Sequence, residues 1–180
     1  MLRTILIYGV IAGLIVIVPM SLMLTFGPDG DHGGGSVLQG YLTMVVALSL
    51  IFIGVKRYRD KALGGVIKFV PALLVGLGIS AVAGVIYVIG WEITLQATNF
   101  SFIESYATAM LERAQAKGAS AAELEKITKE MAAFKTQYAD PLFRLPMTFV
   151  EIFPVGVVIS LVSAALLRNS RFLPARQAGA

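Results

Sequence analysis

The sequence contains no cysteine and a single histidine, His32, among its 180 residues. Without cysteine, the chain can form no disulfide, no thiolate nucleophile and no cysteine-based metal site. One histidine also excludes a histidine-rich metal centre, and no Gly-Lys-Ser/Thr phosphate loop is present. We therefore expect no metal site, no cofactor and no catalytic residues, and we predict that the protein is not an enzyme.

Charge is also scarce, since only 14% of the residues are charged, against about 25% in soluble domains. Hydrophobic residues make up 57% of the chain and form runs of about twenty, long enough for a helix to cross a bilayer. The short alternating segments of a transmembrane β-barrel are missing. We predict an all-α membrane protein with four transmembrane helices and an amphipathic helical hairpin between the third and fourth.

The predicted spans cover about residues 5–26, 37–55, 67–91 and 146–167. The first follows Arg3 and could be read as a signal peptide. Its apolar run is longer than a signal-peptide core, however, and no A-x-A-like cleavage site follows it. We therefore expect this segment to be retained as the first span of a single membrane domain, residues 1–180.

Small residues recur at every fourth position in three of these spans, which gives each helix a ridge that another helix can approach closely. Gly76, Gly78 and Ala81 also match G-x-G-x-x-A, but a dinucleotide fingerprint must follow a strand, and this match lies within an apolar span. The predicted packing positions are Gly9 and Gly13 in the first span, Ala72, Gly76, Ser80 and Gly84 in the third, and Gly156, Ser160 and Ala164 in the last.

The loop after the first span, Gly27–Ser36, has the composition of a turn. Asp29, Asp31 and His32 could in principle hold a cation. No glutamate completes an EF-hand loop, however. We therefore predict a solvated turn without a metal ion.

Residues 94–145 form the one sizeable polar stretch and predict two helices joined by a short turn. Ser101 with Glu104 and Ser120 with Glu123 read as capping boxes, and Gly118 is a helix stop signal between them. Apolar residues recur at heptad-like spacing along the second helix, and we expect them to be core of the hairpin or contacts to a neighbouring subunit. They are Leu124, Ile127, Met131, Phe134 and Tyr138.

Basic residues lie mainly at one end of the predicted bundle: Arg3, five from Lys56 to Lys68, and three in the tail, residues 168–180. The stretch from Lys56 to Glu92 begins with this charge and ends with Trp91 at the opposite interface. By the positive-inside rule both termini and the tail are cytoplasmic, and the hairpin is extracytoplasmic. Topology thus explains the net charge of +4, and we expect no nucleic-acid partner.

The basic cluster itself consists of Lys56, Arg57, Arg59 and Lys61, with Asp60 among them. These four side chains can contact anionic lipid head groups, although fixing the topology is sufficient reason for their presence. We expect Asp60 to pair locally with Lys56 or Arg57.

Two carboxylates are the candidates for a functional role, Glu92 and Glu151. Glu151 lies about five residues into the last predicted span, and an ionisable group there is expensive to place. It could relay a proton or contact a cation, or it could bond across helices or reach the interface. Glu92 could be simply solvated, or it could meet Glu151 where the third and fourth spans pack. Arg144 is a further possible partner for Glu151.

Several stretches resemble a family of bacterial membrane proteins described as domain-of-unknown-function family 4199. The resemblance implies a four-helix integral membrane protein, and hence a multi-pass protein of the bacterial cytoplasmic (inner) membrane. It implies no activity, so no residue role follows from it. The stretches that carry it are Gly40–Asp60, Gly64–Gly65, Tyr87–Ile93, Met110–Glu112 and Pro141–Gly156.

The sequence is compatible with three functions. The small-residue ridges and the amphipathic hairpin favour a non-enzymatic assembly or accessory protein, which contacts the lipid bilayer and a second copy or another membrane protein. A proton- or cation-coupled transporter component using Glu92 and Glu151 is the alternative. A membrane enzyme ranks last, because no nucleophile, metal ligands or phosphate loop converge.

Overall fold

The structure of the protein is a computed structural model that describes residues 1–26 and 37–175. The predicted turn with Asp29, Asp31 and His32, and Arg176 of the tail, lie outside the described residues. Within these residues the chain forms seven helices: α1 (Leu2–Phe26), α2 (Val37–Leu48), α3 (Leu50–Ala62), α4 (Phe69–Ala97), α5 (Ser101–Ala116), α6 (Ala121–Tyr138) and α7 (Pro141–Leu167).

Four helical stretches in the described part of the chain are long and apolar enough to cross a membrane. They are α1, the joined pair α2–α3 (Gly40–Ala62), α4 and α7, which confirms the predicted fold class. At a rise of about 1.5 Å per residue, α4 and α7 are each about 40 Å long, against about 30 Å of hydrocarbon. Both therefore extend beyond the predicted spans, and they do so at the hairpin end of the bundle.

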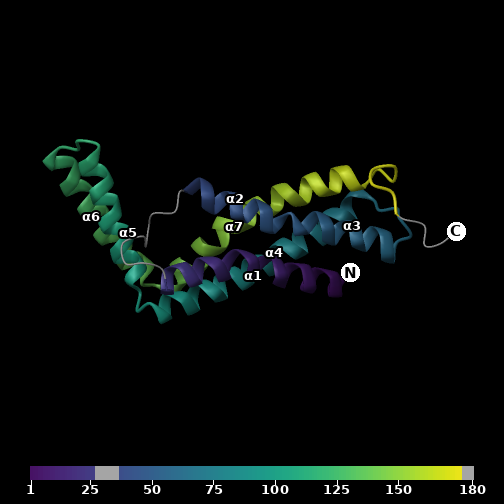
Figure 1. Cartoon of the computed structure of the whole chain (residues 1–180), viewed down its shortest axis with the longest axis horizontal. Coiled ribbons are helices and arrows are strands. Elements are labelled where there is room, and N and C mark those ends of the chain that lie inside the picture. The colour runs from purple at the N-terminus through teal and green to yellow at the C-terminus, as the bar shows by residue number, and fades with distance from the viewer. Residues whose placement is uncertain (27–36, 176–180) are drawn as a thin grey trace.

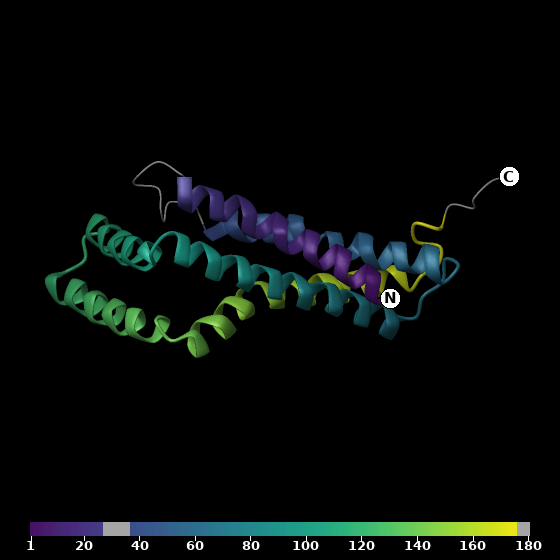
Figure 2. The same ribbon diagram turned by 90° about the horizontal axis from the view of Figure 1, so that it is seen from below.

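Helix α4 lies at the centre of the bundle and packs against α1 on one face and α7 on another (Figure 2). A Cβ added at Gly9 or Gly13 would lie 2.5 Å from Val82 Cβ or 2.7 Å from Ile86 Cβ, so α1 approaches α4 through these two glycines. A Cβ at Gly76 would lie 2.8 Å from Ser160 Cβ. The small residues therefore set how close the helices lie.

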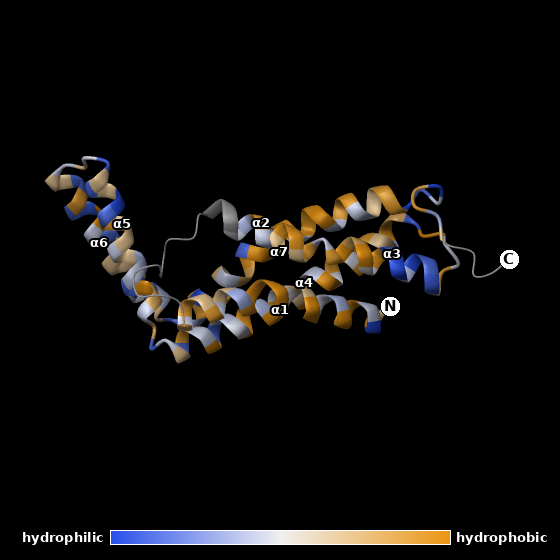
Figure 3. Cartoon of the chain, viewed as in Figure 1, coloured by the Kyte–Doolittle hydropathy of each residue, from blue (hydrophilic) through white to orange (hydrophobic). Residues whose placement is uncertain are grey.

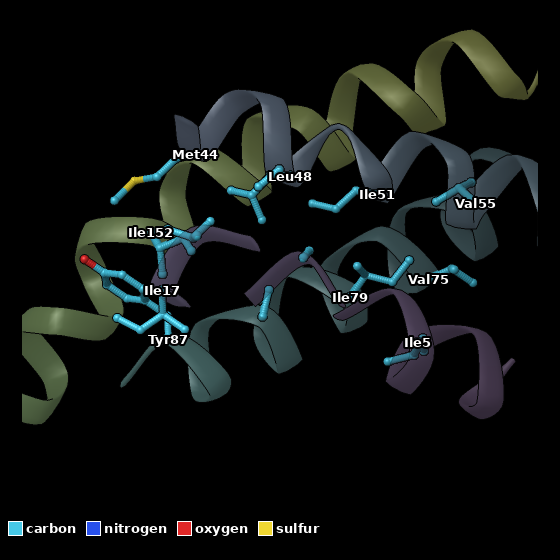
Figure 4. Packing of buried hydrophobic residues seen from close by; sticks show 14 of the residues in the cluster. Ile5, Ile17, Met44, Leu48, Ile51, Val55, Val75, Ile79, Tyr87 and Ile152 are labelled. Carbon is cyan, nitrogen blue, oxygen red and sulfur yellow. The ribbon is translucent and has the colours of Figure 1, made fainter. Parts of the chain in front are cut away.

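Three more small residues of the ridges, Ser80, Gly84 and Gly156, lie at the contact between α4 and α7. Gly156 lies directly against Ser80 and Gly84 lies against the ring of Phe149, while Ala72 and Ala164 are fully buried. Apolar side chains of α2–α3, among them Leu48, Ile51 and Val55, belong to the same buried cluster (Figure 4). The apolar core thus runs along the length of the bundle.

The second span is interrupted at Ser49, whose hydroxyl donates to the Val46 carbonyl at 2.6 Å. Helix α3 then continues to Ala62, so the basic cluster lies on a helix rather than in a loop. The chain turns at Gly64 and Gly65, which have positive φ angles of 66° and 94°. Glycine adopts this conformation without steric cost.

Helices α5 and α6 form the predicted hairpin, which extends from one end of the bundle, away from the end where α1 begins and α7 ends (Figure 1). Ser120 and Glu123 make the predicted capping box at the start of α6, and Gly118 turns the chain at φ 79°. The box predicted at Ser101 is wrong, because Phe100 precedes α5 in a left-handed conformation with φ 58°.

The hairpin is mainly exposed, and its surface mixes polar and apolar residues, in contrast to the spans (Figure 3). The predicted seam residues lie along one side, but four of the five are only half-buried and Tyr138 alone among them is buried. Glu104 crosses to the second helix and pairs with Lys135 at 2.6 Å, instead of capping α5. Two helices alone cannot fully enclose this seam.

Candidate functional site at the base of the hairpin

Arg144 and Glu92 form a paired contact where the hairpin joins the bundle. Arg144, near the start of α7, donates from Nε to Glu92 Oε1 at 2.6 Å and from Nη2 to Oε2 at 2.7 Å. Its side chain is 4% exposed, and that of Glu92 is 22% exposed. Planar pairing through two parallel bonds is the strongest geometry available to these two groups.

The third nitrogen of Arg144 binds the chain that leaves the hairpin. Nη1 donates to the carbonyl of Tyr138 at 2.8 Å and to that of Ala139 at 3.3 Å. The guanidinium also lies over the rings of Phe100 and Tyr138, at 5.3 and 5.7 Å from their centroids. A single buried side chain thus contacts the ends of α4 and α6 and the residue before α5.

Trp91 makes a second connection at the same level. Its Nε1 donates to the hydroxyl of Tyr138 at 2.6 Å, and its ring packs edge-on against Phe102 of α5 with centroids 4.9 Å apart. Burial raises the pKa of the Tyr138 phenol above its ordinary value, since a phenolate would be poorly solvated there. We call Glu92, Arg144, Trp91 and Tyr138 the clamp.

Glu151 lies on α7 apart from the clamp and takes a different partner from Glu92. Its Oε2 accepts one hydrogen bond from the hydroxyl of Tyr87 at 3.3 Å. Tyr87 is otherwise buried in the core, next to Ile17 and Ile152 (Figure 4). The residue Glu151 as a whole is exposed on the surface of the chain. Glu92 is thus held by Arg144 on both oxygens, whereas Glu151 has one long bond.

A groove of about 370 Å³ opens between Glu151 and the hairpin. Aromatic and methionine side chains from α1, α4, α5, α6 and α7 make up most of its wall, with Glu151 and Thr148 on one side. We call it the hairpin groove; it is lined by Met20, Tyr87, Trp91, Phe102, Ile103, Tyr106, Met131, Phe134, Tyr138, Met147, Thr148 and Glu151.

The four residues of the basic cluster, at the other end of the bundle, differ in exposure and in their partners. Arg57 and Lys61 are exposed, as a contact with lipid head groups requires. Lys56 binds Asp60, as predicted. Arg59 is fully buried and donates to the carbonyls of Phe172 and Leu173 after α7. The predicted lipid contact is therefore wrong for Arg59, which fixes the chain that follows the last span.

The sequence reasoning found both carboxylates but missed the aromatic partners of the site. Tyr87 and Tyr138 read as ordinary apolar positions of a span and a helical seam. Spacing alone does not show that their hydroxyls meet Glu151 and Trp91 across 64 and 47 residues. Among the described residues, no group of three histidine, aspartate or glutamate side chains could hold a metal ion.

These features define a helical membrane protein in which a two-helix hairpin is held at one end of the bundle. The chain belongs to the family described as "Protein of unknown function (DUF4199)", whose model matches residues 7–169. No curated protein and no solved structure matches the chain.

Proposed function

We propose that the protein is a non-enzymatic assembly or accessory protein that holds the α5–α6 hairpin as an arm for contact with a second copy or another membrane protein. The observation that carries this proposal is the clamp. Holding a buried arginine against a half-buried glutamate costs desolvation that an apolar pair would avoid. The clamp offsets that cost with bidentate geometry and contacts to every helix end at the hairpin base.

The predicted topology indicates on which side of the membrane the arm lies. The basic excess at the opposite end supports cytoplasmic termini by the positive-inside rule, and the arm then lies outside the cytoplasm. The apolar seam of α6 is half-buried. A partner that covered it would remove apolar surface from water, which is favourable, and this supports the seam as a contact surface.

A photoreactive side chain placed on the arm tests the proposal. We would introduce it at Gln115 of α5 and at Ala132 of α6, both exposed, with a matched position at Leu42, which is 56% exposed on α2. We expect discrete protein adducts from the two arm positions in native membranes, at the mass of a dimer or of a second protein.

The same positions combined with Arg144→Ala complete the test. That change frees the arm while leaving its surface intact, so adduct yield should fall. Adducts to lipid alone at the arm positions, or yields from Leu42 equal to theirs, would contradict the proposal.

A second candidate function, a proton- or cation-coupled transporter component, rests on Glu151 and Tyr87. Glu151 lies in a helix able to span the membrane and keeps one carboxylate oxygen beyond the Tyr87 bond. Glu92 is a poor second member of such a pathway because both its oxygens bind Arg144. Proton or solute flux in vesicles, lost in Glu151→Gln, would support this candidate, and flux unchanged by that substitution would exclude it.

A further inference from the structure

The hairpin groove has the size and position of a small-molecule site. Its volume of about 370 Å³ lies within the usual range for such sites, about 300–1,000 Å³. It is formed where the arm meets the bundle, so residues from α1 and α4 to α7 contribute to it. Ligands commonly bind at such junctions between parts of a protein.

The wall of the groove suits a positively charged group. Four aromatic residues, Trp91, Phe102, Tyr106 and Phe134, are among those that line it, and aromatic faces attract cations through their quadrupole. Methionines supply an adaptable apolar surface for the rest of a ligand.

Glu151 gives the groove its charge. It is the one ionisable carboxylate among the described residues that line the groove, and neither lysine nor arginine is among them. Arg144 lies over the ring of Tyr138 but does not line the groove, and its charge is balanced by Glu92. A phospholipid head group would bring a phosphate close to Glu151 with no basic side chain to balance it, so the charge pattern favours a cation without a phosphate.

A second hollow of similar size has a different lining. About 380 Å³ lies between α4 and the start of α7, lined by apolar side chains that include Val85, Leu142 and Phe149. It has no charged residue in its lining and suits lipid tails. The hairpin groove combines apolar walls with one carboxylate.

We propose that the hairpin groove binds an amphiphilic organic cation, with an amine or quaternary ammonium group at Glu151 and an apolar body against the aromatic wall. The inference goes beyond the assembly role and does not depend on it, because the groove is complete within one chain. It requires no passage of the ligand across the membrane.

Trp91 provides a direct measurement of binding, because it is the one tryptophan of the sequence and it lines the groove. We would titrate the full chain in lipid nanodiscs with (4-phenylbutyl)trimethylammonium and with its neutral isostere, in which carbon replaces nitrogen. The cation should change Trp91 emission in a saturable manner, with an affinity at least about tenfold higher than that of the isostere.

Three variants assign the effect to the groove. Glu151→Gln should weaken cation binding about tenfold, whereas Glu125→Gln removes the same charge from an exposed position of the arm and should leave it unchanged. Tyr106→Ala removes the aromatic ring of a residue that is 37% exposed, without opening the core, and should weaken binding about threefold.

Equal affinity for the cation and its isostere, or equal loss in Glu151→Gln and Glu125→Gln, would overturn the proposal. If Glu151→Gln does not fold, unchanged affinity in Tyr106→Ala would overturn it alone. A failure of the arm to cross-link would leave these binding results unaffected, so the two proposals fail separately.

Discussion

The base of the hairpin and the arm itself are held by different means. At the base, Arg144 is buried, makes two bonds to Glu92 and reaches the chain that leaves α6. Along the arm, the contacts between its helices include the exposed pair Glu104–Lys135 and a half-buried apolar seam. Exposed pairs contribute little to stability, whereas removing one partner of a buried pair costs much. The direction of the arm is therefore fixed more firmly than the contact between its two helices.

The largest effect should come from Arg144→Ala, which leaves the Glu92 carboxylate without its counter-charge. We expect a loss of about 3–5 kcal/mol in the free energy of unfolding, measured by denaturant titration in detergent micelles. The double variant Arg144→Met with Glu92→Leu should recover most of that loss, because it removes both charges. A single variant as stable as the double one would show that the pair does not hold the base.

Tyr138→Phe should cost less, about 1–2 kcal/mol, since it leaves the buried Trp91 N–H without its acceptor. The same titration measures it, and Trp91 emission reports the local change. Phe134→Leu is the matched control, because Phe134 belongs to the same helix but makes no hydrogen bond through its ring. If the control costs as much as Tyr138→Phe, packing rather than the hydrogen bond holds this side of the base.

The titration of Tyr138 should also make the stability of the fold depend on pH in the alkaline range. Its pKa is raised in the folded chain by burial, so the unfolded chain loses the phenol proton first, near pH 10. The stabilisation of the fold by the protonated Tyr138 phenol is present in full below that pH and is lost as pH rises towards the folded pKa. Tyr138→Phe should remove this part of the alkaline loss in unfolding titrations above pH 9. An identical alkaline profile in the variant would contradict the assignment.

Glu151→Gln should change stability by less than about 1 kcal/mol, because Glu151 has one hydrogen bond of 3.3 Å and an amide oxygen can accept it. Glu92→Gln is the matched comparison at the same end of the bundle, and it should cost more because it removes the counter-charge of Arg144. Equal losses in the two variants would contradict the claim that Glu92 is held by Arg144 and Glu151 by one weak hydrogen bond.

The smallest effect should appear in the arm, as a local change with pH. Lys135 lowers the pKa of Glu104 through a hydrogen bond and charge. The contribution of this pair to the stability of the arm is therefore present above the ordinary carboxyl pKa. It is lost as pH falls through the lowered pKa that Glu104 has in the folded chain. Hydrogen exchange in α5 and α6, corrected for its intrinsic pH dependence, should lose protection on acidification more in the wild type than in Glu104→Gln. Equal acid sensitivity in both would contradict this.

The spans and the hairpin could be predicted because each depends on local pattern: apolar length, small residues spaced by four, and turn residues such as Gly118. Contacts between distant segments could not. The sequence left Glu92 either solvated or close to Glu151, and offered Arg144 as a partner for Glu151. In the structure Arg144, in the first turn of α7, binds Glu92 instead. Arg59 was read as a surface charge because its neighbours are basic, although the chain after α7 covers it.

The distance between the arm and the bundle tests the central claim, that the clamp fixes the direction of the arm. The chain has no cysteine, so spin labels can be attached specifically at Lys117→Cys near the tip and Leu14→Cys on α1, both exposed. Pulsed electron paramagnetic resonance in nanodiscs should give one narrow distance distribution, which Arg144→Ala broadens. A broad distribution in the otherwise unaltered chain, or a narrow one that persists in Arg144→Ala, would contradict the claim.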